Sequence, residues 1–114
     1  MNALKNRVQL IGNLGQTPVV KNLQNGKKVV RMSIAINESY KNGNGENMNE
    51  TYWHTIVAWG KTAEIAERFL VKGSEVAIDG KLVSRVYTAS DGQKKFITEV
   101  VANELLLLTR KASE

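Results

Sequence analysis

Alternation of apolar and polar residues with a period of two dominates this sequence and limits the folds open to it. Three segments show the alternation most clearly: residues 8–14, 30–37 and 76–83. In the second, Val30, Met32 and Ile34 alternate with Arg31 and Ser33. Successive side chains of a strand point to opposite faces, so each segment predicts a strand with one buried and one polar face.

Two further strands are predicted at residues 51–59 and at about 95–108, which are rich in β-branched and aromatic types. In residues 51–59 the odd positions carry Trp53, Val57 and Trp59. Alternation alone leaves open which face of that strand is the core. Both tryptophans can therefore be core residues or exposed functional residues at this point, because large aromatic side chains are usually mostly buried.

One segment alone has helical spacing, between Lys61 and Leu70. Thr62 is the expected N-cap and Gly73 the expected stop. The element order is therefore β-β-β-α-β-β. This order predicts an all-β OB-fold, a five-stranded, partly open Greek-key barrel with one helix between strands 3 and 4. We expect one domain over residues 1–109, followed by a short end at 110–114.

Turns and loops are marked by glycine and asparagine. Asn25-Gly26 predicts the turn between the first two strands, and Asp91-Gly92 predicts a late hairpin turn. Residues 41–50 carry almost nothing that could be buried, so we expect a long polar loop there.

Charge and composition narrow the class of partner. The 114 residues carry a formal net charge of +5, which favours a polyanion, nucleic acid first and an anionic membrane surface second. A merely soluble basic protein remains the alternative. The chain has no cysteine and one histidine, so we expect no disulfide, no metal site and no cofactor. The absence of cysteine favours a reducing, intracellular location, and no apolar run is long enough to cross a membrane.

Four blocks in the right order carry a resemblance to the bacterial single-stranded DNA-binding protein family. They are N-x-V-x-L-x-G-N-L-G-x-x-P at 6–18, E-T-Y-W-H-x-x-V-x-x-G-K at 50–61, L-x-K-G-S-x-V-x-I-x-G at 70–80, and G-Q-x-x-x-x-T-E-V at 92–100. The likeness extends from about residue 6 to residue 108. It is more specific than any single motif, because spacing and order agree together.

The resemblance implies a homotetramer of OB-folds with single-stranded DNA wrapped around it. It places the base-stacking aromatic residues at Tyr40, Trp53, Trp59 and Tyr87, and it places His54 at the subunit interface. Relatives usually end in a flexible linker with an acidic tip that recruits replication and repair enzymes. This sequence stops without either feature, so we expect a tail-less relative or a shortened chain, and we do not predict tail-mediated recruitment.

Cations lie between the aromatic residues along the sequence, as binding of a single strand requires. The predicted phosphate contacts are Arg7, Arg31, Lys41, Lys61, Lys72, Arg85 and Lys95. Lys41 follows Tyr40 directly, and Arg85 lies two residues before Tyr87. The remaining aromatic residues are assigned to packing: Tyr52, Phe69 and Phe96.

These residues predict sequence-independent binding and protection of single-stranded DNA during replication, repair or recombination, in the cytoplasm and associated with the nucleoid. The alternative is a primosome-type accessory protein that acts mainly through protein partners. A structural oligomer component or a membrane-surface binder is a third interpretation. No catalytic residue is predicted: Asp79 and Glu99 have no recognisable partner base, and Gly60-Lys61-Thr62 lacks the upstream glycine of a phosphate-binding loop.

Overall fold

A computed structural model describes residues 5–108 of the chain. It contains one sheet of six strands and one helix. The strands are β1 (Val8–Leu14), β2 (Val19–Asn22), β3 (Lys28–Lys41), β4 (Asn47–Trp59), β5 (Glu75–Thr88) and β6 (Lys94–Leu107), and helix α1 (Gly60–Phe69) lies between β4 and β5. The expected short end at residues 110–114 lies outside the described residues.

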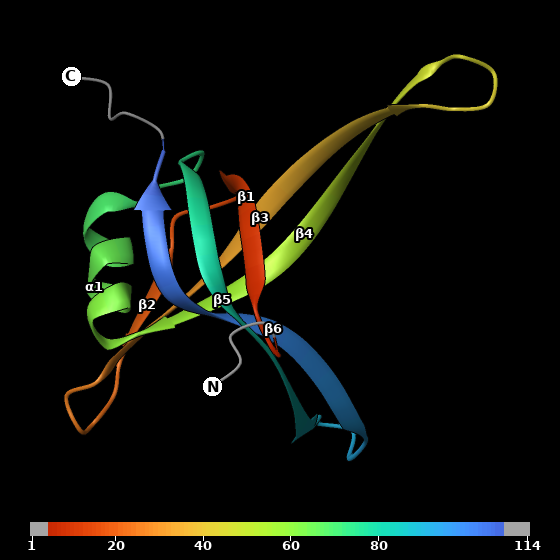
Figure 1. The fold of residues 1–114 in the computed structure, drawn as a ribbon. Helices are drawn as coiled ribbons and strands as arrows, with labels where there is room; N and C mark the ends of the chain where they lie inside the picture. The colour runs from red at the N-terminus through yellow and green to blue at the C-terminus, as the bar shows by residue number, and fades with distance from the viewer. Residues whose placement is uncertain (1–4, 109–114) are drawn as a thin grey trace.

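The strands close into a barrel (Figure 1). Their order is β1-β5-β6-β4-β3-β2, and β1 also pairs with β3, which completes the ring. The β1–β3 joint has two residue pairs, and the parallel joint between β4 and β6 also has two, Ile56 with Val100 and Val57 with Val101. The predicted all-β OB-fold with one helix is confirmed, although its ring of pairings is closed rather than partly open.

The core lies inside the barrel and under α1. The even-numbered side chains of β3 point inward, so Val30 and Ile34 have no exposed surface. Ile56 and Ala58 do the same on β4, which settles the face of that strand. Helix α1 contributes the buried Ala63 and Ala66 to this core. Trp53 and Trp59 have the opposite parity and lie outside it.

Two glycines allow the backbones of paired strands to approach closely. A Cβ atom at Gly80 would lie 2.2 Å from the carbonyl oxygen of Val101, and one at Gly12 would lie 2.6 Å from that of Ala35. Gly80 also stands at the one irregularity in the β5–β6 register, a bulge between Asp79 and Gly80. Both contacts are with backbone, which cannot move aside without disturbing the ring.

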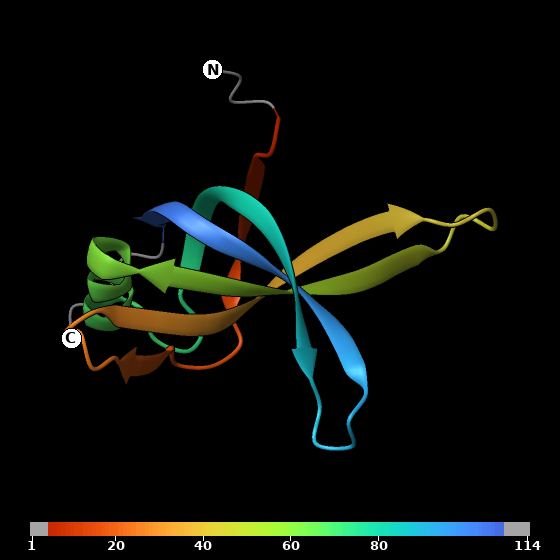
Figure 2. The same cartoon turned by 90° about the horizontal axis from the view of Figure 1, so that it is seen from below.

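Several sequence predictions about connections are wrong. Residues 41–50 are not a long loop, because β3 continues to Lys41 and β4 begins at Asn47. Cross-strand hydrogen bonds hold the segment as a hairpin, including Ser39 Oγ to Asn49 Oδ1 at 2.7 Å. Residues 37–53, almost all exposed, form a hairpin that we call the β3–β4 arm. Figure 2 shows the arm and the β5–β6 hairpin leaving the barrel in different directions.

The Asn25-Gly26 turn joins β2 to β3 rather than the first two predicted strands. Strand β2 has only four residues and lies at the edge of the sheet, too short for its alternation to be recognised. The helix begins at Gly60 with Trp59 as its N-cap, so Thr62 lies in the first turn and is not the cap. Gly60 has a φ of 59°, and β4 therefore turns directly into α1 with no loop residue to supply a cap. The helix ends at Phe69, before the predicted stop.

We predict that Gly80→Ala destabilises the fold by about 2 kcal/mol or more, because the added methyl group overlaps the Val101 carbonyl. The measurement is the free energy of unfolding from a denaturant titration. Gly43→Ala is the matched control, since nothing lies within 4 Å of a Cβ atom there. Equal stability of the two variants would contradict the close approach at Gly80.

Candidate nucleic-acid interface

The odd-numbered side chains of β3 and β4 form the outer face of the barrel. Arg31 and Val57 are cross-strand neighbours on this face, and Trp59 lies next to them on β4. The parallel pair of Val57 with Val101 connects the outer face of β4 to that of β6. One continuous outer surface therefore spans β3, β4, β6 and β5.

A groove with a volume of about 680 Å³ lies on this surface, and we call it the Trp59 groove. Most of its lining is apolar, with Trp59 and a few charged side chains among the valines. Its residues are Val19, Val20, Lys21, Leu23, Val29, Arg31, Val57, Trp59, Val83, Arg85, Glu99 and Val101. Three of them belong to β2, the strand that the sequence did not predict. Trp59 is 47% exposed, so its ring is open to the solvent.

The charged centre of the groove is the carboxylate of Glu99, whose side chain is only 6% exposed. Arg85 donates to it from Nε at 3.1 Å and from Nη2 at 3.4 Å. Arg31 donates from Nη1 at 2.6 Å and also from Nη2. Two predicted phosphate-binding arginines from different strands thus meet on one acid. Sequence reasoning missed this role for Glu99, because only the strand order brings β3, β5 and β6 to the same groove.

Trp53 lies on the same outer face of β4 and is 60% exposed. Its ring covers Gly15, where a Cβ atom would lie 2.5 Å from Cζ3 and 2.9 Å from Cη2. The turn that carries Lys72 is bonded to the same loop, with the Lys72 N–H donating to Thr17 Oγ1 at 3.3 Å. The Trp53 ring and the backbone of Lys72 therefore both contact the loop that follows β1.

Tyr87 and Lys95 extend this surface along the β5–β6 hairpin. They are cross-strand partners, and Arg85 shares their face two residues earlier on β5. Tyr87 is 44% exposed. Lys41 has the odd parity of Trp53 and lies near the end of the β3–β4 arm. Seven of the predicted contact residues of this surface thus come from strands: Arg31, Lys41, Trp53, Trp59, Arg85, Tyr87 and Lys95.

Tyr40 lies on the opposite face of the β3–β4 arm, because it precedes Lys41 in a continuous strand. Its neighbours there are Tyr52 and Glu50. The charge of Glu50 raises the pKa of both tyrosines above its ordinary value, and desolvation and hydrogen bonding to Glu50 add to the increase. The structure therefore separates Tyr40 from the tryptophans and places it in an acidic setting, and its stacking role stays a prediction.

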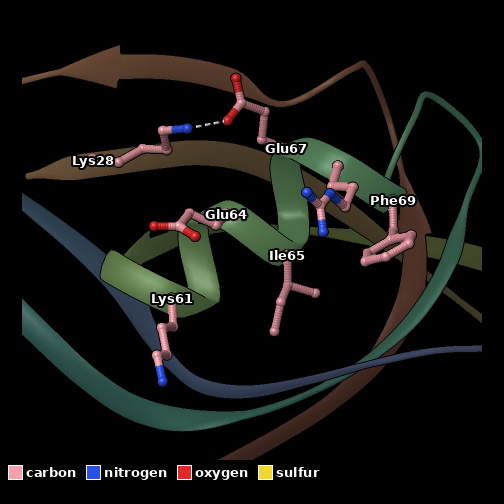
Figure 3. A pocket seen from close by; sticks show the side chains of 7 residues that line it. Lys28, Lys61, Glu64, Ile65, Glu67 and Phe69 are labelled. Carbon is pink, nitrogen blue, oxygen red and sulfur yellow. Dashed lines mark hydrogen bonds and ion pairs between the residues drawn. The ribbon is translucent and has the colours of Figure 1, made fainter.

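Two predicted cations also lie away from the Trp59 groove. Arg7 forms a bidentate ion pair with Asp79, in which Nε donates to Oδ1 at 3.0 Å and Nη2 donates to Oδ2 at 3.1 Å. Lys61 lies in the first turn of α1 and lines a separate surface groove on the helix, together with Phe69 (Figure 3). In that groove Lys28 is paired with Glu67.

His54 lies opposite Ile34 on the inward-facing parity of β4 and is half-buried, and its role at a subunit interface stays a prediction. The assignment of three aromatic residues to packing is wrong. Tyr52 is 44% exposed, Phe69 43% and Phe96 77%. Tyr52 and Phe96 lie on hairpins that extend beyond the barrel, and Phe69 is the exposed last residue of α1. The sequence pattern does not reveal these placements.

We predict that Gly15→Ala displaces the Trp53 ring and leaves the fold almost unchanged, within about 0.5 kcal/mol, because an exposed ring can swing away. The measurement is acrylamide quenching of Trp53 fluorescence in a Trp59→Phe background, and we expect the quenching to increase. Gly43→Ala is again the control. Identical quenching in both variants would contradict the contact between Trp53 and Gly15.

We predict that Glu50→Gln lowers the pKa of Tyr40 and Tyr52, because the phenolate forms then no longer face the negative charge of Glu50. Phenolate absorbance during an alkaline titration measures this shift. Glu104→Gln, on a strand of the barrel away from the arm, is the control. A titration curve that is the same for the wild type and Glu50→Gln would contradict the contact.

Comparison with known proteins gives one consistent result. The model of the Single-strand binding protein family matches residues 5–108. A single-stranded DNA-binding protein of Xanthomonas axonopodis pv. citri is 43% identical over 103 residues, 90% of this chain and 57% of the relative. Single-stranded DNA-binding protein 1 of Xylella fastidiosa is 40% identical over 107 residues, 93% of this chain and 79% of the relative.

Among solved structures, a Plasmodium falciparum SSB in complex with ssDNA superimposes with a TM-score of 0.84 at 33% identity, covering 91% of this chain and 95% of that one. The chain spans less than two thirds of the length of two relatives: 57% of the X. axonopodis protein and 60% of a single-stranded DNA-binding protein of Xanthomonas campestris pv. campestris. The match to the family model, by contrast, extends over almost the whole of this chain. The chain therefore belongs to the single-strand binding protein family.

Proposed function

We propose that this chain binds single-stranded DNA without sequence preference and protects it during replication, repair or recombination. The observation that carries the proposal is the outer surface of the barrel. Trp53, Trp59 and Tyr87 expose between 44% and 60% of their surface there, on strands that also present Arg31 and Arg85. Rings with this exposure contribute little to the core.

Each part of this surface suits one part of a single strand. Unstacked bases have π-faces of any sequence, and an exposed tryptophan or tyrosine ring stacks on them. Phosphates attract cations, and arginine presents its N–H groups in a planar fork that suits a phosphate. The valine lining of the Trp59 groove gives a base an apolar surface beside the ring of Trp59. Binding that uses stacking and charge alone reads no base edge, which supports the absence of sequence preference.

The comparisons support the proposal. The relatives are named single-stranded DNA-binding proteins, and the P. falciparum SSB was solved with ssDNA. They give no support to the accessory-protein alternative.

We also propose that the chain acts as a homotetramer with His54 at an interface, that it is not an enzyme, and that it works in the cytoplasm near the nucleoid. No helix of residues 5–108 has the length and apolar character to cross a membrane.

Within the site, we propose that the DNA path follows the outer surface from the β3–β4 arm to the β5–β6 hairpin. Of the predicted phosphate contacts, the lysines exposed along that path are Lys41, Lys72 and Lys95. Tyr40, Arg7 and Lys61 contact DNA only where a strand passes over the edge of the arm or barrel, and we rank them below the others. The binding domain is proposed to correspond to residues 1–109.

We predict that Trp53→Ala and Tyr87→Ala each weaken binding of oligo-dT by about 1–3 kcal/mol, because each removes one stacking ring. Fluorescence anisotropy of labelled oligo-dT measures the affinity, with duplex DNA of equal length as the comparison. Phe69→Ala is the matched control, an equally exposed ring on the helix groove, away from the outer surface.

The predicted result is a loss of affinity in the two site variants and none in the control. Equal affinity in all three variants would contradict the assignment of the outer surface as the DNA-binding site. Equal affinity of the wild type for single-stranded and double-stranded DNA would contradict the proposed function itself. A site with about four phosphate contacts also predicts a log–log salt dependence with a slope near −3.

A further inference from the structure

Glu99 is the only buried acidic side chain among residues 5–108, and it lies inside an apolar groove. A carboxylate taken out of water is costly unless it is paired and hydrogen-bonded. Well-packed apolar groups often stabilise a fold as well as a buried ion pair does. Since Val57, Val83 and Val101 line the same groove, stability alone does not account for an acid at this position.

The contacts of Glu99 leave both arginines open for a ligand. A guanidinium group has five N–H donors. Arg85 turns the edge with Nε and Nη2 toward Glu99, and Arg31 uses its two Nη groups. The two arginine side chains remain 52% and 43% exposed. Each therefore presents further donors to the solvent from a fixed position.

The charge balance of the cluster has two consequences. Glu99 holds two like charges together at one end of the groove, which would repel each other without it. It also reduces their combined formal charge from two to one. The hydrogen bonds from Arg85 to Glu99, and then the charge of Glu99, raise the pKa of Arg85 above the ordinary value. The acid thus orients the arginines and, at the same time, weakens their attraction for an anion.

We propose that Glu99 is a positioning residue for phosphate binding, which fixes the guanidinium groups of Arg31 and Arg85 beside Trp59 and lowers the local charge. This inference rests on the proposed function. It assigns a role in DNA binding to an acidic residue at the centre of a basic site. The role has two opposing parts, and salt separates them, because salt screens charge but does not restore the orientation of a side chain.

The test is the salt dependence of oligo-dT binding by Glu99→Gln. The variant retains the shape of the side chain but loses the negative charge and one of the two acceptor oxygens that hold the guanidinium groups. We expect its log–log slope to be steeper than that of the wild type by about 0.7, the value for one additional phosphate charge on a single strand. At high salt we expect binding about three- to tenfold weaker, because two arginines must then be ordered on binding.

Glu104→Gln is the matched control. Glu104 lies on the same strand, opposite Asp79 and in a different surface groove, and its replacement changes the net charge equally. Parallel salt plots for Glu99→Gln and the wild type would overturn the proposal, and so would tighter binding of Glu99→Gln at every salt concentration. A wild type that does not bind oligo-dT would instead overturn the proposed function.

Arg85→Lys keeps the proposal testable if Glu99→Gln does not fold. Lysine preserves the charge and loses the planar fork. We expect Arg85→Lys to bind oligo-dT several-fold more weakly than the wild type, with an unchanged slope. Binding equal to the wild type would overturn the proposal, because the orientation held by Glu99 would then have no effect.

Discussion

The short parallel joint between β4 and β6 is the interaction on which the rest of this structure depends. It consists of two residue pairs, Ile56 with Val100 and Val57 with Val101. Ile56 and Val100 face the core, whereas Val57 and Val101 face outward. The joint therefore closes the barrel on its inner side and joins two outer faces on the other. Without it, the arginines of β3 and β5 would belong to separate surfaces.

The same alternation that builds the core also builds the site, because a strand has only two faces. Once Ile34 and Ile56 are committed to the interior, Trp53 and Trp59 must point outward. The β3–β4 arm follows a different rule, since beyond the barrel neither face is buried. Both of its faces then become available, one for Trp53 and the other for the Tyr52 and Glu50 cluster.

Much of the fold could be predicted from the sequence, because most strands alternate strongly. The alternation of residues 30–37 gave the correct inner face, and the helix was placed to within a few residues. Strand β2 was missed, since four edge residues carry too little pattern. Residues 41–50 were assigned to a loop, because an exposed hairpin buries nothing that could mark it. The aromatic residues could be named from resemblance, but the separation of Tyr40 from Trp53 follows only from the hairpin in which β3 continues to Lys41 and stays paired with β4.

The formal charge of +5 is therefore an incomplete guide to the electrostatics of the surface. Three of the seven predicted cations are paired: Arg7 with Asp79, and both Arg31 and Arg85 with Glu99. Pairing across strands depends on strand order, which composition does not contain. A basic site with a buried acid also differs physically from a basic site without one. Glu99 lowers the net charge of that site and fixes the direction of its two arginines, and salt screens such partly buried pairs less than it screens exposed charges.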